Sequence, residues 1–144
     1  MTEAPAGAVV LDTHALVWLL QGSPRLGPQS RAQIEAAAAT DRAFVAAISV
    51  WEIAMLVAKG RLALDREVGE WIAAALSLPG LRLAPLDPRV AVDATRLPGE
   101  IHGDPADRMI VATARQRAAT LITDDQLVLQ YSTDGHVKAH RAAT

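Results

Sequence analysis

HGDPADRMIVATARQRAATLITDD, residues 102–125, is the stretch that decides the fold. Its proline follows Asp104 directly, which is typical of the first turn of a helix with the aspartate as N-cap. The helix that this start predicts continues to about Ala118, and a short apolar strand over residues 119–123 follows it. The stretch therefore predicts a helix that leads into a buried strand, with acidic residues at both of its ends.

The same alternation of apolar runs and helical segments extends over the rest of the chain. We expect strands at 8–11, 43–48, 81–86, 119–123 and, at an edge, 136–140, with helices at 15–20, 29–39, 49–59, 65–78, 87–97, 104–118 and 125–131. Strands that alternate with helices form a parallel sheet covered by helices on both faces. The prediction is one α/β domain over residues 1–144, a three-layer α/β/α sandwich with four to five parallel strands, whose residues 1–7 and 142–144 fray.

Local signals place several helix starts. Ser49 with Glu52 three residues later has the spacing of a capping box, in which each side chain bonds the other's backbone N–H. Asp65 is expected to cap the next helix, and Asp87 before Pro88 the one after it.

Composition limits the function. The 144 residues are 51% hydrophobic, carry a formal net charge of −2 and include no cysteine, which excludes disulfides, thiolate zinc sites and cysteine nucleophiles. The first residues have neither a basic region nor a long apolar run, and no apolar stretch reaches the roughly 18 residues of a membrane span. We therefore expect a cytoplasmic protein that is not a bulk nucleic-acid coat protein.

Four acidic residues lie where a strand is expected to end or a helix to begin: Asp12, Glu52, Asp107 and Asp125. Ligands of parallel α/β sheets bind outside the carboxyl ends of the strands, so these acids are expected to share one cleft. Two carboxylates about 4 Å apart repel by about 4 kcal/mol at an effective dielectric constant of about 20. Mg²⁺ or Mn²⁺ would offset that repulsion, which predicts a metal-dependent enzyme acting on phosphate esters.

Three of the four acids also have a structural explanation. Glu52 fits a capping box, Asp107 complements a helix dipole, and Asp125 fits a helix cap. Asp12 is the exception, because a bare carboxylate directly after a buried strand is costly. The structural explanations account for the acids singly, but not for their common edge of the sheet.

Three stretches carry a family resemblance: VVLDTHALVWLL (9–20), ISVWEIAMLVAKGRL (48–62) and residues 97–125, with QLVLQY directly after. In this order and spacing they resemble PIN-domain proteins, and within that family the VapC-type toxin ribonucleases. The resemblance implies a PIN-like sandwich and an endoribonuclease that uses Mg²⁺, with Mn²⁺ as substitute. It also implies RNA substrates of the transfer or ribosomal class, a homodimer, and inhibition by a cognate VapB-type antitoxin.

Carried over by position, the resemblance gives an acidic quartet, an extra acid and two hydroxyl residues. These are, in turn, Asp12, Glu52, Asp107 and Asp125; then Asp104 of the HxDPxDR pattern; then Thr13 and Thr123. We expect Asp12 and Asp107 to hold the metal directly, and Glu52, Asp104 and Asp125 to hold its waters. Asp124 remains an alternative to Asp125 as the fourth acid.

Several basic residues and histidines near these motifs are less strongly indicated as site residues. Lys59, Arg61 and Arg108 are candidate RNA contacts. The alternative for Lys59 is a pairing with a carboxylate, and the alternative for the two arginines is a solvated surface charge. His14 and His102 flank acidic motifs and are expected to be hydrogen-bonded structural groups rather than metal ligands.

The tryptophans Trp18, Trp51 and Trp71 lie on apolar helical segments. We expect them in the core or a dimer interface rather than as platforms for nucleobases.

Four other functions fit the sequence less well. A receiver-type phosphoacceptor would need two paired acids before the phosphorylated aspartate and a later lysine, for which the motifs give no position. A dehalogenase-like phosphatase would need an acid where His14 stands. A Rossmann oxidoreductase would need a glycine-rich loop that is missing. A PIN fold used only to bind protein is the non-enzymatic alternative, and the complete acid set argues against it.

Overall fold

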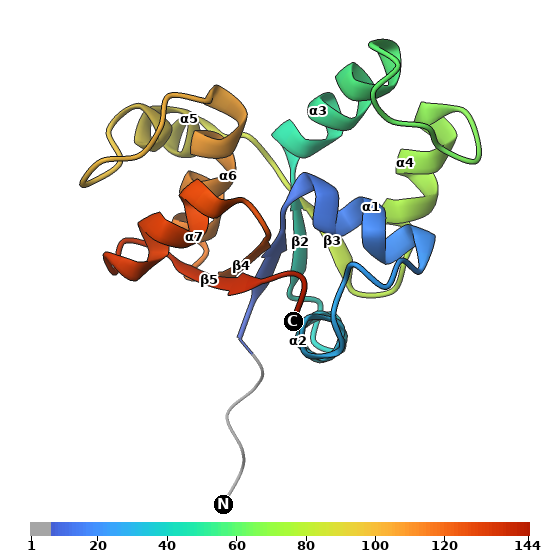
Figure 1. Cartoon of the computed structure of the whole chain (residues 1–144), viewed down its shortest axis with the longest axis horizontal. Helices are drawn as coiled ribbons and strands as arrows, with labels where there is room; N and C mark the ends of the chain where they lie inside the picture. The colour runs from blue at the N-terminus through green and yellow to red at the C-terminus, as the bar shows by residue number, and fades with distance from the viewer. Residues whose placement is uncertain (1–6) are drawn as a thin grey trace, which may run out of the picture.

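The computed structural model describes residues 7–144, and the expected fraying of residues 1–6 lies outside this part of the chain. Within it, five parallel strands form one sheet in the order β3-β2-β1-β4-β5 (Figure 1). The strands are β1 (Val9–Leu11), β2 (Ala43–Ala46), β3 (Leu81–Ala84), β4 (Thr120–Thr123) and β5 (Lys138–Arg141). The helices are α1 (Thr13–Gln21), α2 (Pro28–Ala38), α3 (Ala47–Ala58), α4 (Val68–Leu76), α5 (Pro88–Thr95), α6 (Pro105–Gln116) and α7 (Gln126–Thr133). The predicted fold class and the order of elements are confirmed.

Two hydrophobic cores lie on the two faces of the sheet. In the central strand β1, Val9 and Leu11 point into the core that α1, α2 and α4 cover, whereas Val10 points into the core beneath α5, α6 and α7. Side chains of successive strand residues alternate between faces, so this fully buried strand must be apolar throughout. The arrangement is the predicted three-layer sandwich. No helix of residues 7–144 is long and apolar enough to cross a membrane.

Some of the predicted helix starts are correct and others are wrong. Asp87, Asp104 and Asp125 are N-caps, and each accepts a hydrogen bond from the backbone N–H three residues later. Glu67, instead of Asp65, caps α4 through the N–H of Gly69.

The predicted capping box of α3 does not form. The helix begins at Ala47, so Ser49 lies inside its first turn, and the N-cap Ala46 has no side-chain hydrogen bond. The Thr13 hydroxyl at the start of α1 instead donates to Glu52 and also makes a hydrogen-bond contact with the Ser49 hydroxyl. The hydrogen bond from Thr13 therefore positions the Glu52 carboxylate in the site, and Glu52 does not cap its own helix.

The expected fraying of residues 142–144 is also wrong. Ala142 is fully buried, and its N–H donates to the carbonyl oxygen of Thr123 at 2.9 Å. Its carbonyl accepts from Gly27 N–H, and the Thr144 carbonyl accepts from Gln29 N–H, both at 2.8 Å. A Cβ at Gly27 would lie only 2.3 Å from the Thr144 carbonyl carbon, so the glycine permits this close approach.

Candidate metal centre

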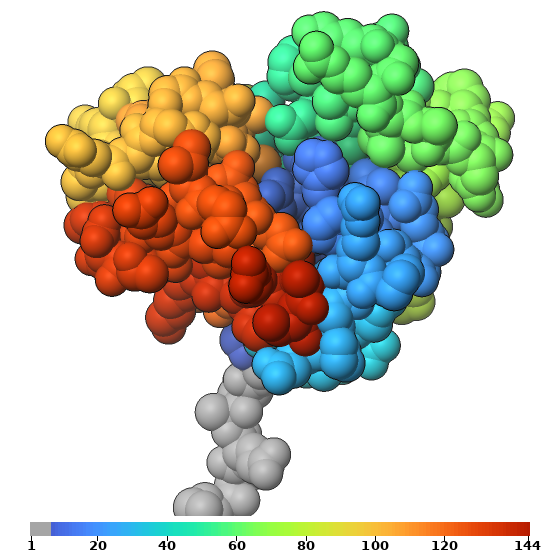
Figure 2. All heavy atoms as spheres, in the orientation of Figure 1, coloured from blue at the N-terminus to red at the C-terminus, as the bar shows by residue number. Residues whose placement is uncertain are grey.

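The predicted acids meet at the carboxyl edge of the sheet. Asp12 follows β1, Glu52 lies on α3, Asp104 and Asp107 begin α6, and Asp125 follows β4. Together with His14, Trp18 and Asp124 they line one cavity of about 360 Å³, which no lysine or arginine of residues 7–144 lines. Figure 2 shows the molecule hollowed between the yellow and orange α5–α6 side and the green α3 side, with the start of α1 in blue at the base.

Asp12 is held by the ends of two neighbouring strands. Its Oδ1 accepts from the Thr13 N–H and its Oδ2 from the Thr123 hydroxyl, both at 2.6 Å. Burial raises the pKa of Asp12 above its ordinary value, and these two hydrogen bonds oppose the rise. Thr123 Oγ1 also accepts from the Asp125 N–H at 3.0 Å, so one hydroxyl links two acids.

Glu52 is oriented by a chain of hydroxyl groups. The Thr13 hydroxyl contacts Glu52 Oε1 and lies 3.1 Å from the Ser49 Oγ, and both Thr13 and Ser49 are fully buried. Burial raises the pKa of Glu52, and the charges of Asp12 and Asp104 add to that rise. Thr13 thus has the supporting position that the sequence indicated, whereas Ser49 was taken only for a helix cap.

The carboxyl group of Asp107 has a strongly raised pKa. Burial, followed by the charges of Asp104, Asp125, Asp12 and Glu52, raises the pKa of Asp107 from 3.8 to about 7. The charges of the other four acids therefore all act on Asp107. Such repulsion is what a bound divalent cation relieves.

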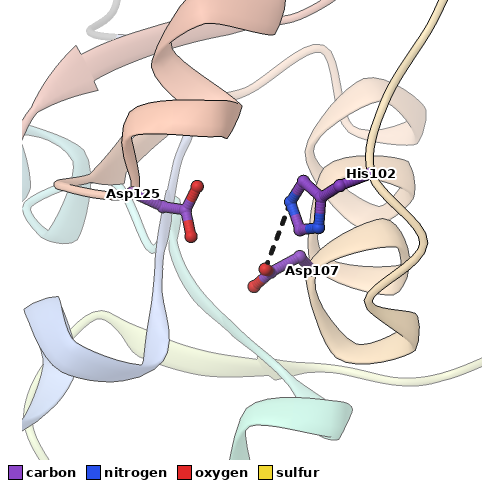
Figure 3. Close-up of side chains that lie close together, drawn as sticks. All are labelled: His102, Asp107 and Asp125. Carbon is purple, nitrogen blue, oxygen red and sulfur yellow. Dashed lines mark ion pairs between the residues drawn. The ribbon is translucent and has the colours of Figure 1, made fainter.

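His102 lies beside the acids without lining their cavity, and its ring is hydrogen-bonded as the sequence indicated. Figure 3 shows His102 from the loop before α6, Asp107 from α6 and Asp125 from the start of α7 pointing toward one another. Each offers one metal-ligand atom, and these atoms lie within 4.8 Å of one another. His102 Nε2 lies 3.3 Å from Asp107 Oδ2, and Nδ1 accepts from the Asp104 N–H at 3.4 Å. The histidine of the HGDPADR motif was the available sequence signal.

The two candidates for the fourth acid have different partners. Asp124 Oδ1 accepts from the Ala143 N–H at 3.1 Å and so holds the C-terminal segment. Asp125 caps α7 with Oδ1 and lies in the group with His102 and Asp107. Both line the cavity, and this geometry favours Asp125 as the fourth acid.

The candidate RNA contacts do not line the cavity. Lys59 and Arg61 are exposed just beyond the end of α3. The Arg108 guanidinium donates to the carbonyls of Ala94, Ile101 and His102, at 2.7, 3.3 and 3.4 Å. Arg108 therefore has a structural position that the sequence did not indicate.

The donor set fits a hard divalent cation. Carboxylate oxygens predominate and the cavity leaves room for water. Burial first, and the charges of neighbouring acids second, raise the pKa values of Asp12, Glu52 and Asp107. Mg²⁺ and Mn²⁺ prefer this environment. The His102 imidazole adds a nitrogen donor that suits Mn²⁺ better than Mg²⁺.

Comparisons with known proteins agree with this geometry. Residues 9–132 match the PIN domain. Ribonuclease VapC22 of Mycobacterium tuberculosis is 36% identical over 118 residues, which cover 82% of this chain and 87% of that protein. The structure of VapBC2 from Rickettsia felis, bound to a DNA fragment from its promoter, is similar with a TM-score of 0.67 at 16% identity. The match covers 92% of this chain and 97% of that chain. The structure of FitAcB from Neisseria gonorrhoeae has a TM-score of 0.63 at 24% identity, and the match covers 93% of this chain and 97% of that chain. The chain belongs to the PIN domain family, among its VapC-type members.

Proposed function

We propose that this protein is a metal-dependent endoribonuclease and the toxin of a VapBC pair, using Mg²⁺ with Mn²⁺ as substitute. The observation that carries the proposal is the convergence of Asp12, Glu52, Asp104, Asp107 and Asp125 in one cavity that no lysine or arginine of residues 7–144 lines. A fold retains such repulsion where a cation is to be bound. The similarity to a protein named Ribonuclease VapC22 supports RNA as the substrate.

Some residues of the site would bind the ion or its waters, and others orient these acids. In the proposal, Asp12 and Asp107 hold the ion directly, while Glu52, Asp104 and Asp125 hold its waters. When bound, the ion would lower the pKa of a coordinated water and neutralise charge on the attacked phosphate. The threonine hydroxyls of Thr13 and Thr123 keep Glu52 and Asp12 in fixed orientations, so that little reorganisation is needed on binding.

A VapB-type antitoxin is the proposed partner, because solved structures of this fold include a member of the VapBC family of toxin–antitoxin systems. An arginine or lysine of the antitoxin placed among Asp12, Glu52 and Asp107 would make strong charge-assisted bonds. It would exclude both the cation and RNA without any change of fold.

A homodimer is also proposed. Helix α3 is apolar around most of its circumference, yet only Ser49 and Ile53 of its residues are buried, and Trp51 is 57% exposed. Apolar surface of this kind favours pairing. Sedimentation at tens of micromolar protein tests this, and a monomer would contradict it.

RNA cleavage by the purified, antitoxin-free protein tests the function. Transfer and ribosomal RNAs are incubated with Mg²⁺, Mn²⁺ or chelator, and Asp12→Asn is compared with Asp93→Asn. Asp93 is an exposed aspartate of α5 outside the acid cavity, so its variant controls for loss of one charge. We expect cleavage by the wild type and Asp93→Asn with metal only, and none by Asp12→Asn.

Two outcomes would contradict the proposal differently. RNA that stays intact with metal present and antitoxin absent would indicate a PIN fold that only binds protein. Cleavage that persists in chelator, and that Asp12→Asn removes, would instead indicate a metal-independent reaction around His14 and His102.

A further inference from the structure

Helix α1 supplies an aromatic wall to the acid cavity. His14 and Trp18 lie one helical turn apart, so both side chains project from the same face of α1, and both line the cavity beside Asp12. Their ring centroids are 6.2 Å apart and the rings are tilted by 48°. The carboxylates are therefore bordered on this side by flat, unsaturated rings.

The three tryptophans have three different environments. Trp71 is 4% exposed within the core, as the sequence predicted, and Trp51 is 57% exposed on α3 away from the acid cavity. Trp18 is half-buried: it packs against the core and also lines the cavity. An indole with one side fixed by packing and another bordering a site is a rigid surface for a planar ligand.

A cation lies beside this indole. The guanidinium carbon of Arg25, in the turn after α1, is 5.8 Å from the centroid of the Trp18 ring. Within residues 7–144 the Arg25 side chain has no ion pair or hydrogen bond, and the residue is exposed. Its charge is therefore available to an anion that approaches the edge of the acid cavity.

An acid cavity repels RNA, so the substrate needs attractive contacts at the border of that cavity. We propose that Trp18, flanked by His14 and Arg25, is a binding subsite for one unpaired nucleobase next to the cleaved bond, with Arg25 contacting a neighbouring phosphate. The subsite deepens the proposed nuclease function and rests on it. Stacking on an indole is tolerant of sequence but requires the base to be unpaired, so the substrate class is single-stranded RNA.

Tryptophan fluorescence tests the subsite without cleavage. A single-stranded RNA oligonucleotide is titrated in Mg²⁺ into the Asp12→Asn protein, alone and combined with Trp18→Phe or Trp51→Phe. We expect the RNA to quench the emission in Asp12→Asn and in the Trp51→Phe combination. Quenching should be largely lost with Trp18→Phe, and duplex RNA of the same sequence should quench none of the proteins.

Affinity measurements separate stacking from packing. Replacing Trp18 by leucine should weaken binding of the single strand about tenfold, whereas phenylalanine, which keeps a ring, should recover most of the affinity. Trp51→Leu, which keeps an apolar side chain on the exposed face of α3, is the matched control and should bind like its parent. Arg25→Gln should lower the magnitude of the slope of log affinity against log salt concentration by the amount that corresponds to about one phosphate contact. In the otherwise wild-type protein, Trp18→Leu should raise KM with little change in kcat.

Quenching that is equal in the Trp18→Phe and Trp51→Phe proteins would overturn the subsite, as would Trp18→Leu binding as tightly as Trp51→Leu. If Trp18→Leu does not fold, the phenylalanine variant decides through its quenching. These outcomes are separate from the fate of the nuclease proposal, because failure of the wild type to cleave any RNA would leave the binding measurements interpretable.

Discussion

His102 Nε2 lies 3.3 Å from Asp107 Oδ2. This contact joins the loop before α6 to Asp107, whose pKa is raised to about 7. The other ring nitrogen, Nδ1, accepts from the backbone N–H of Asp104, so the imidazole is held between two acids of the site. Within residues 7–144 Nε2 makes no hydrogen bond, so it faces the Asp107 carboxylate at close range and limits the orientations open to it.

Replacing His102 by alanine should therefore weaken metal binding. We expect activity at limiting Mg²⁺ to fall about tenfold and to recover at higher Mg²⁺, in line with the loss of a group that orients a ligand. Titration of cleavage with Mg²⁺, and direct binding of Mn²⁺, measure this. His140→Ala is the control, because His140 lies on β5 and contacts Thr144 outside the site. An unchanged metal dependence would show that His102 does not act on Asp107.

The stability of the metal-free protein should depend on pH through Asp107. Its carboxyl has a pKa of 3.8 when unperturbed and about 7 in the fold, so between these values the folded chain binds more protons than the unfolded chain. Stability should therefore fall as pH rises from about 4 to about 7 and then level off. Because Asp107 is partly exposed, we expect an effect on the order of 1–2 kcal/mol.

Urea unfolding in chelator, at several pH values, measures this fall. Asp107→Asn should be more stable than the wild type at pH 8 and should have a smaller fall over the same range. Equal pH dependence in the two proteins would contradict the prediction. Saturating Mg²⁺ should restore wild-type stability at pH 8, because the ion binds the deprotonated acid.

Thr123→Val should disturb two acids at once. Valine resembles threonine in shape but removes the hydroxyl that donates to Asp12 Oδ2 and accepts from the Asp125 N–H. We expect a loss of about 1–3 kcal/mol, a further rise in the pKa of Asp12, and a pH profile of cleavage displaced to higher pH. Thr123→Ser keeps the hydroxyl and should remain close to the wild type in unfolding and pH profile. Similar behaviour of the two variants would contradict this role.

Much of the fold was predictable because its signals are local. Proline after Asp87 and Asp104 marked helix starts, and short apolar runs marked strands that are buried on both faces. The convergence of Asp12 and Asp125 followed from one topological fact, since parallel strands that lie side by side end at the same edge.

What could not be predicted depends on which distant side chains meet. Ser49 and Glu52 have capping-box spacing, yet Thr13, which lies 36 and 39 residues away along the chain, is their hydrogen-bond partner. The local pattern fits both arrangements, and tertiary packing selects one. For the same reason, the buried position of Ala142 was not visible in a C-terminal segment without a local signal.

Variants of Arg108 can distinguish a structural role of this residue from an RNA-binding role. Its guanidinium spans from Ala94 to the carbonyls of Ile101 and His102, and so fastens the loop that carries His102 to the start of α6. Lysine keeps the charge but has a single ammonium that cannot reach these three acceptors together. We therefore expect Arg108→Lys and Arg108→Ala to lose similar stability, about 1–3 kcal/mol, and to exchange amide hydrogens faster in residues 96–104.

Arg89→Ala, which removes an exposed arginine of α5, should change neither stability nor exchange. A phosphate contact would have a different signature. Arg108→Ala would then weaken RNA binding without loss of stability, and Arg108→Lys would retain most of the affinity because the positive charge remains. Hydrogen exchange and RNA affinity measured on the same three variants decide between the two roles, and faster exchange in both Arg108 variants would assign the residue to the loop that positions His102.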